Sequence, residues 1–355
     1  MPLKKLDQIK QQLRRVITPK PPLTNLVFKG GGVRGIAYLG ALQVLDQYGL
    51  LKDLKRVGGT SAGSLTALML SMHMDTAEIA QTLAQIHFPD LLQELDDEEH
   101  HGIVKNLLQD TACVMRFRNR FGWYANHKIH NLLEQLVARG CNGNGRATFA
   151  DFWEMGHRNI YIIASNISRY RRELFSYETT PQVAVADAAL MSSSIPIFFE
   201  PVRFDGKLIG SGDYYVDGGI YDNYPIHVFD RPEYAMHGRN YRSGINYETL
   251  GFFLYPPKYK DDSVHMPVKW NEFIELIFSN LYISYQVQPI MTSEVDIHRT
   301  VLINDCGIKA TDFHITADSD KYRMLLESGR NATRAFLEAH EYIEPDDEHQ
   351  LGGDF

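Results

Sequence analysis

A serine set between two glycines is the first residue of this chain whose context suggests chemistry. The segment Gly59-Thr60-Ser61-Ala62-Gly63 fits the pattern G-x-S-x-G, in which a sharp strand-to-helix turn exposes a serine hydroxyl. Small flanking residues let the chain turn without clashes. A serine at such a turn can also serve only as the N-cap of the helix. The motif alone makes Ser61 a candidate nucleophile and leaves the structural explanation open.

A second glycine-rich segment, Gly-Gly-Gly-Val-Arg-Gly at residues 30–35, lies between an expected strand and an expected helix. It matches G-x-G-x-x-G, the fingerprint of a dinucleotide-binding turn, which would make the chain an oxidoreductase. That fingerprint needs an acidic residue at the end of the next strand, about 20 residues on. Asp53 lies near this spacing but precedes the strand. The lysine and hydroxyl of a phosphate-binding P-loop are missing as well.

Acyl transfer is a better use for these glycines. Consecutive backbone N–H groups at the start of a helix stabilise negative charge. The carbonyl oxygen of an ester becomes anionic when a serine attacks it, so residues 30–35 would form an oxyanion hole.

Asp217, followed by Gly218 and Gly219, is a candidate base. A serine hydroxyl is a weak nucleophile until a base takes its proton. An aspartate can take it in a dry site with a short contact, although its usual pKa is about 3.9. Asp213 and Asp222 compete for the role, and Asp-Gly-Gly by itself is a common turn.

The order of these three motifs resembles that of the patatin-like phospholipase family. Further segments look like the same family, namely Ser192-Ser193-Ser194-Ile195-Pro196, Phe199, Pro201-Val202 and Asn223-Tyr224-Pro225. The resemblance covers roughly residues 24–230 and extends more weakly to residues 320–337. Residues 75–147 match nothing in it.

The resemblance implies a lipid acyl hydrolase acting on phospholipids or lysophospholipids of membranes, without a metal or an organic cofactor. Ser61 would be the nucleophile and Asp217 its base, a dyad without histidine. The implied oxyanion hole consists of the backbone amides of Gly31, Gly32 and Val33, with Arg34 nearby. Some relatives act only when a partner protein or a membrane switches them on.

Two residues of the loop carry charge. Arg34 would steady the loop or attract a lipid phosphate, unless it is an ordinary surface cation. Lys29 departs from the family, which often has a small or acidic residue there. It would change the charge of the loop without removing the backbone amides.

Two further alternatives stay open. A Ser-His-Asp triad would recruit one of the 14 histidines, and the candidates that follow the motifs are His227, His237, His298 and His314. None of the four stands in a recognisable motif. A non-catalytic membrane-binding module is the other alternative, and the intact Ser61 and Asp217 weigh against it.

The elements that must position these residues alternate between strands and helices. We expect strands at residues 25–29, 54–57, 159–166, 173–177, 198–204 and 250–255, and helices at 36–47, 64–74, 183–191, 268–287 and 319–340. Two successive strand–turn–helix units predict a three-layer α/β/α fold with a central, mostly parallel sheet. We expect one catalytic domain over residues 23–340, with residues 75–147 as a helical insertion or cap.

The two ends of the chain and an acidic cluster stand apart. Residues 1–22 predict a basic amphipathic helix, which either packs on the domain or lies on an anionic membrane. Residues 341–355 form an acidic tail that we expect to be mobile. Residues 96–101 contain four acids and two histidines, a solvated helix face rather than a metal site.

Composition excludes several classes of protein. The net charge of −8 argues against a nucleic-acid-binding surface. Three cysteines without a CxxC pair indicate a reducing compartment and no cysteine metal site. No apolar run reaches the ~18 residues that span a bilayer, and the N-terminus lacks a secretory pattern. We expect a cytoplasmic protein, peripheral at a membrane or exported without an N-terminal signal.

Overall fold

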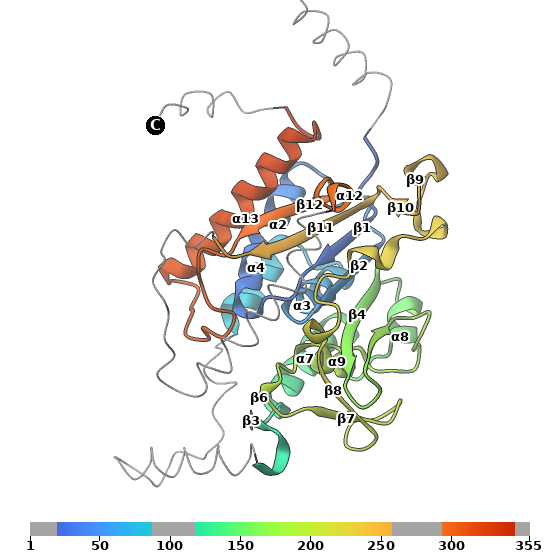
Figure 1. Cartoon of the computed structure of the whole chain (residues 1–355), viewed down its shortest axis with the longest axis vertical. Coiled ribbons are helices and arrows are strands. Elements are labelled where there is room, and N and C mark those ends of the chain that lie inside the picture. The colour runs from blue at the N-terminus through green and yellow to red at the C-terminus, as the bar shows by residue number, and fades with distance from the viewer. Residues whose placement is uncertain (1–19, 87–117, 258–292, 345–355) are drawn as a thin grey trace, which may run out of the picture.

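The computed structural model describes residues 20–86, 118–257 and 293–344 (Figure 1). An eight-stranded sheet forms its centre, in the order β12-β11-β1-β2-β4-β8-β7, with β5 also paired to β4. The strands are β1 (Asn25–Phe28), β2 (Arg56–Thr60), β4 (Asn159–Asn166), β5 (Arg171–Phe175), β7 (Val202–Phe204), β8 (Asp213–Asp217), β11 (Thr249–Tyr255) and β12 (Thr300–Asn304). Pairs from β12 to β4 are parallel, and the pairs that involve β5, β7 and β8 are antiparallel.

In the described part of the chain, α-helices pack with the large core on one face of this sheet, and the 3₁₀ turns of residues 226–234 pack on the other. The α-helices are α2 (Ile36–Gln47), α3 (Ala62–Ser71), α4 (Thr76–Gln85), α7 (His127–Gly140), α8 (Phe149–Glu154), α9 (Val185–Ser193), α12 (Glu294–Ile297) and α13 (Asp320–Ala339). Side chains alternate along β1, so that Leu26 and Phe28 join the large core beneath α2 and α13. Val27 joins a smaller cluster with η3 (Ile226–Phe229) and η4 (Pro232–Tyr234). The expected mostly parallel α/β sheet is confirmed.

Near the motifs, one predicted strand has the wrong bounds and one strand was not predicted. We expected the second strand to end at Val57, but β2 continues through Gly58 and Gly59 to Thr60. Glycine fits there because a Cβ on Gly59 would lie 2.4 Å from the carbonyl carbon of Gly63. The glycine-rich stretch before residue 222 also hides the strand β8, which alternation did not reveal.

Residues 75–147 are largely helical where they are described. They include α4 and α7, and also a short strand, β3 (Gly122–Tyr124), which pairs with β6 (Ile197–Phe199). The remaining small strands are β9 (Tyr241–Arg242) and β10 (Ile245–Asn246), and the remaining 3₁₀ turns are η1 (Gly32–Gly35), η2 (Gly218–Ile220) and η5 (Gly238–Asn240).

Several expectations fall outside the described residues. These are most of the N-terminal helix of residues 1–22, the acidic cluster at 96–101, the helix at 268–287 and the tail beyond residue 344. The domain division stays a prediction. In the part of the chain that the structure describes, no helix is both long enough and apolar enough to cross a membrane.

A buried ion cluster joins the turn η3 to the start of β12. The Arg299 guanidinium is almost fully buried and donates to Asp230 (2.6 Å) and Asp296 (2.7 Å). His227 reaches the same two carboxylates, with Nδ1 2.8 Å from Asp230 and Nε2 3.3 Å from Asp296. Hydrogen bonds to Asp230 and Asp296 raise the pKa of His227 to about 9. The protonated imidazole therefore stabilises this end of the fold.

This raised pKa predicts how stability changes with pH. Protonated His227 contributes its full stabilisation below its ordinary pKa of 6.5 and loses it as the pH rises through about 9. The free energy of unfolding should therefore fall between pH 6.5 and 9, as measured by urea denaturation. His227→Gln should flatten this slope, whereas His314→Gln, outside the cluster, should not. An equal slope in wild type and His227→Gln would contradict the assignment.

Candidate active site

Ser61 stands at the sharp turn between β2 and α3. Its φ of +53° and ψ of −126° lie in a region that non-glycine residues seldom adopt, and such strain is common at functional sites. Its backbone N–H donates to Ser192 Oγ at 2.9 Å, which helps to hold the turn. A Cβ on Gly63 would lie 2.2 Å from the carbonyl oxygen of Phe28, so glycine allows α3 to begin directly against β1.

Two strands share one edge of β4 and bring Asp217 to this turn. Thr60, the last residue of β2, pairs with Ile163, and Asp217, the last residue of β8, pairs with Ala164. Because β5 occupies the opposite edge of β4 at both positions, β2 and β8 must lie on the same edge. The carboxyl ends of β2 and β8 therefore meet head-on. A Cβ on Gly218 would lie 2.3 Å from the carbonyl oxygen of Ile163 and 2.7 Å from Thr60 Cγ2, so only glycine fits at this junction.

The Asp217 carboxylate is hydrogen-bonded to the Ser61 hydroxyl in a nearly dry site. Ser61 is 5% exposed and Asp217 is 7% exposed. Burial raises the pKa of Asp217 to about 6, and the hydrogen bonds donated by the Ser61 hydroxyl and the Gly219 N–H oppose this rise. The Gly219 bond is 2.7 Å long, and the Asp217 N–H donates to the carbonyl of Ser194 at 2.8 Å. This arrangement can receive a proton from the serine near neutral pH.

The two competing aspartates have arginine partners. Asp213 accepts hydrogen bonds from Arg169 and, at 3.0 Å, from Asn166. Asp222 accepts from Arg172 at 2.6 Å. The carboxylate of Asp217, unlike these two, has a serine hydroxyl as its side-chain partner.

Among the described residues, no histidine ring is hydrogen-bonded to Ser61 or Asp217. His227 belongs to the Arg299 cluster, and the ring of His298 faces that of His340 at 5.9 Å. His237 meets Glu248 through its backbone N–H. The described geometry gives no support to a triad.

The glycine-rich loop lies directly beside Ser61. A Cβ on Gly30 would lie 3.1 Å from Ser61 Cβ. The Gly30 N–H donates to the carbonyl of Asn223 (3.0 Å), and Asn223 Nδ2 donates to the carbonyl of Gly30 (3.1 Å). These two bonds join the loop to the turn that follows Asp217. The sequence contained Asn223 within a family-like segment but gave it no role.

One predicted oxyanion donor is engaged elsewhere. The Val33 N–H donates to the carbonyl of Ala310 at 3.0 Å, so the expectation that Val33 supplies a free amide needs correction. Within the described residues, the N–H groups of Gly31 and Gly32 have no hydrogen-bond partner. These two amides are the ones that remain open to a ligand.

The two charged residues of the loop support its backbone. Arg34 donates to the carbonyl of Gly31 (2.9 Å) and to Asp305 (2.7 Å), as the steadying role predicted. Lys29 is buried and donates to the carbonyl of Leu254 (2.8 Å), with its ammonium 4.4 Å from the centre of the Phe253 ring. Burial, and then the nearby Arg34, hold the pKa of Lys29 well below its ordinary range. Its side chain therefore fastens β1 to β11.

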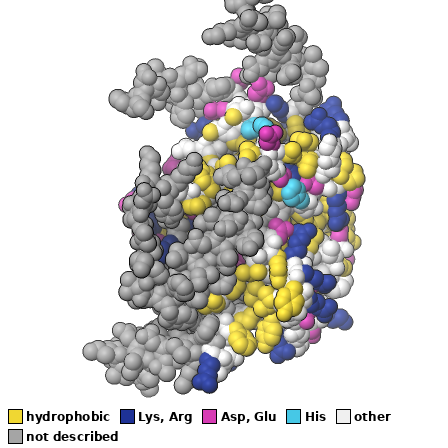
Figure 2. Space-filling model, viewed as in Figure 1, with side chains coloured by type: hydrophobic (Ala, Val, Ile, Leu, Met, Phe, Trp, Pro, Cys, Tyr) yellow, Lys and Arg dark blue, Asp and Glu magenta, His cyan; other side chains and the backbone are white. Residues whose placement is uncertain are grey.

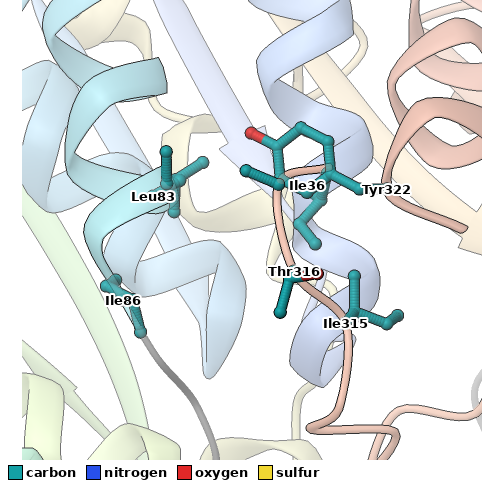
Figure 3. Close-up of a pocket in the computed structure, with 8 residues that line it drawn as sticks. Ile36, Leu83, Ile86, Ile315, Thr316 and Tyr322 are labelled. Atoms are coloured by element: carbon teal, nitrogen blue, oxygen red, sulfur yellow. The ribbon is translucent and has the colours of Figure 1, made fainter. Parts of the chain in front are cut away.

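A small apolar pocket lies next to the helix that follows the loop (Figure 3). Its volume is about 50 Å³, and Ile36, Leu83, Ile86, Ile315 and Tyr322 are among the residues that line it. Ile36 directly follows Gly35, where a Cβ would lie 3.0 Å from the Cβ of Ala62. One lining residue of the pocket therefore directly follows a residue that contacts the turn of Ser61.

The dinucleotide alternative finds no support at this site. Asp53 precedes β2, and β2 ends at Thr60 with Ser61 following, so no acidic residue stands where the dinucleotide fingerprint requires one. The described residues contain no group of three histidine, cysteine or acidic side chains placed to hold a metal ion.

The fold and this geometry define an α/β protein with a serine–carboxylate site at the carboxyl edge of its sheet. The profile of the patatin-like phospholipase family matches residues 26–230, and the chain belongs to this family. The predicted resemblance is thereby confirmed, and lipid acyl hydrolysis is the activity of the class.

The chain is also similar to individual proteins. The chain is 28% identical to the uncharacterized protein YqhO of Bacillus subtilis over 335 residues, which cover 89% of this chain and 98% of YqhO. It is 29% identical over 206 residues to the probable lipid hydrolase 463L of invertebrate iridescent virus 6, covering 57% of this chain and 62% of that protein. Among solved structures, VipD from Legionella pneumophila superposes with a TM-score of 0.56 at 19% identity, covering 90% of this chain and 67% of VipD. The VipD match confirms the predicted fold.

The link between the two loops predicts an effect on stability. Asn223→Asp keeps the size of the side chain, but it removes the donor to the Gly30 carbonyl and places a carboxylate oxygen against it. Loss of this buried hydrogen bond should lower the free energy of unfolding by about 1–3 kcal/mol. Asn144→Asp is the matched control, because exposed Asn144 acts there only as an acceptor, for the Arg146 N–H. Equal stability of Asn223→Asp and wild type in urea denaturation would show that the link contributes nothing.

Proposed function

We propose that this chain hydrolyses fatty-acyl esters of membrane phospholipids or lysophospholipids, with Ser61 as the nucleophile and Asp217 as its base. The observation that carries the proposal is the hydrogen bond between the Ser61 hydroxyl and the buried Asp217 carboxylate. The open amides of Gly31 and Gly32 beside this pair supply the second requirement of acyl transfer, a place for the developing oxyanion.

In the first half-reaction the ester becomes an acyl-enzyme. The Ser61 hydroxyl passes its proton to Asp217 while Oγ attacks the carbonyl carbon of the ester. The carbonyl oxygen becomes an oxyanion and accepts hydrogen bonds from Gly31 and Gly32. Protonated Asp217 then gives its proton to the departing alcohol oxygen as the ester bond breaks, which leaves the acyl group on Ser61.

In the second half-reaction water replaces the alcohol. Asp217 takes a proton from the water, whose oxygen attacks the acyl carbon. The bond to Ser61 Oγ then breaks, the proton returns to Ser61, and the fatty acid leaves. A pKa of about 6 suits this exchange, because Asp217 is ionised at neutral pH yet basic enough to accept a proton.

Two observations favour a lipid substrate. The family is named for phospholipase activity, and relatives that match more than half of this chain are named lysophospholipase and triacylglycerol lipase. The apolar pocket beside Ile36 offers a place for the first part of an acyl chain. We therefore propose that the protein acts at a membrane surface, where a phospholipid substrate resides.

Removing either partner of the dyad should abolish turnover. Ser61→Ala should eliminate labelling by a fluorophosphonate probe, since it removes the attacking oxygen. Asp217→Asn should lower kcat by about 10²–10⁴-fold, because an amide cannot accept the proton. Asp217→Asn should remain fully folded at pH 7.5, since it replaces a buried charge by a neutral group. Asp213→Asn is the matched control and should keep most of the activity. Persistent labelling of Ser61→Ala would refute the nucleophile.

The pKa of Asp217 sets the pH dependence of catalysis. Only the ionised carboxylate accepts the proton, so kcat/KM should rise about tenfold per pH unit below pH 6 and level off above it. A short, soluble ester without ionisable groups should be the substrate, so that only the enzyme titrates. A profile that is flat from pH 4.5 to 6.5 would exclude Asp217 as the base.

A further inference from the structure

Exposed apolar side chains gather at one end of the molecule. They are Phe121 before β3, Ile167 and Tyr170 in the turn between β4 and β5, and Leu208 in the turn between β7 and β8. Tyr170 is 84% exposed, Leu208 61% and Phe121 56%. Single exposed apolar residues are ordinary on a protein surface, but several on adjoining segments mark an interaction site.

Hydrogen bonds and a ring contact show that these segments adjoin. The Ile167 N–H donates to the carbonyl of Tyr214 at 3.0 Å, and the Tyr214 N–H donates to Ser168 Oγ at 2.9 Å. The ring of Phe121 packs edge-on against that of Tyr214, with centroids 6.1 Å apart. Since Tyr214 belongs to β8, the turn between β4 and β5 and the start of β3 both meet at this strand. The turn from β7 into β8 leaves the same strand, because Phe204 pairs with Asp213.

β8 leads from this end toward the active site. Tyr214 and Asp217 both belong to this strand, and two further exposed apolar residues, Ile220 and Tyr221, follow it in the chain. Figure 2 shows hydrophobic side chains gathered in the lower part of the face, where Figure 1 places β6, β7 and β8, with Lys and Arg side chains along their margin. A ligand that covered this end would therefore lie beside the proposed base.

The charge of this end differs from that of the whole chain. The described cations here are Arg118, Arg120, Arg169, Arg171, Arg203 and Lys207, and the acids are Glu173, Glu200, Asp205 and Asp213. Six cations and four acids give +2, whereas the chain as a whole carries −8. Asp205 is exposed and accepts the N–H groups of Lys207 and Leu208 within the turn between β7 and β8.

We propose that this end, which we call the docking end (Phe121, Ile167, Tyr170 and Leu208 with the six cations), lies on the surface of a bilayer that contains anionic phospholipid. The inference rests on the proposed function, since the ester to be cleaved sits in that bilayer. Aromatic and aliphatic side chains separated by arginines suit an interface, because rings and methyl groups enter the acyl boundary while guanidinium groups meet phosphates. A protein partner would instead favour a continuous apolar core.

The test compares two sets of substitutions in the full chain. Phe121→Ser, Tyr170→Ser and Leu208→Ser together remove the apolar contacts of the docking end. Met155→Ser and Met324→Ser form the control, because these residues are also exposed, but Met155 precedes the amino end of β4 and Met324 lies on α13. Binding to phosphatidylcholine vesicles with and without phosphatidylglycerol is measured by cosedimentation, and a short soluble ester reports catalysis.

We expect wild type to bind the vesicles with phosphatidylglycerol more tightly, and added salt to weaken this binding. The triple variant should bind them at least about tenfold more weakly, since three apolar side chains no longer leave water. It should hydrolyse the soluble ester at the wild-type rate, and the control variant should match wild type in both assays. Arg203→Gln with Lys207→Gln should reduce the preference for phosphatidylglycerol.

Unchanged vesicle binding by the triple variant would refute the proposal that the docking end lies on a bilayer. So would binding that disappears only when residues 1–20 are deleted, a result that would move the membrane contact to the N-terminal segment. Failure of wild type to hydrolyse the soluble ester would count against the proposed function. The vesicle measurement would still test membrane binding by the docking end, because it does not depend on hydrolysis.

Discussion

The head-on meeting of β2 and β8 on one edge of β4 is the constraint on which the site depends. Thr60 and Asp217 pair with consecutive residues of β4, so the residue after β2 and the last residue of β8 face each other with little room between them. Gly218 makes the junction sterically feasible, because any side chain there would meet the Ile163 carbonyl. The distance between Ser61 and Asp217 is therefore set by strand pairing, which is far stiffer than a loop.

The same junction explains the electrostatics of the site. Strand ends that meet inside a sheet exclude water, and exclusion of water raises the pKa of Asp217 to about 6. Its neighbours Asp213 and Asp222 keep arginine partners nearer the surface. A buried carboxylate without a cation costs stability, and the fold tolerates it where a serine hydroxyl and the Gly219 N–H supply hydrogen bonds. The surrounding hydrogen bonds of Asn223, Arg34 and Lys29 fix the glycine-rich loop against this pair.

Helices and strands with a clear local pattern of apolar residues could be predicted from the sequence. The helices α2, α9 and α13 and the strands β1, β4 and β11 follow from periodicity, to within a few residues at each end. Prediction from the sequence failed at glycines that are needed because the backbone approaches another segment closely. Gly58 and Gly59 read as a turn but belong to β2, and the glycines around β8 concealed a strand that approaches other backbone closely. The engagement of the Val33 amide by Ala310 could not be foreseen either, because the two residues are far apart in the chain.

The sequence by itself determined the chemical inventory: a serine in a G-x-S-x-G turn, an aspartate before two glycines, a run of amides at a helix start, and their order along the chain. The order of the motifs was enough to identify the family, because it follows the order of the strands along the chain. Tertiary structure decided which aspartate meets Ser61, which loop amides stay open, and which exposed side chains adjoin. Those outcomes depend on strands that are far apart in the chain, because β2 and β8 meet only through their separate pairing with β4. Local sequence does not show which backbone groups such pairing brings together.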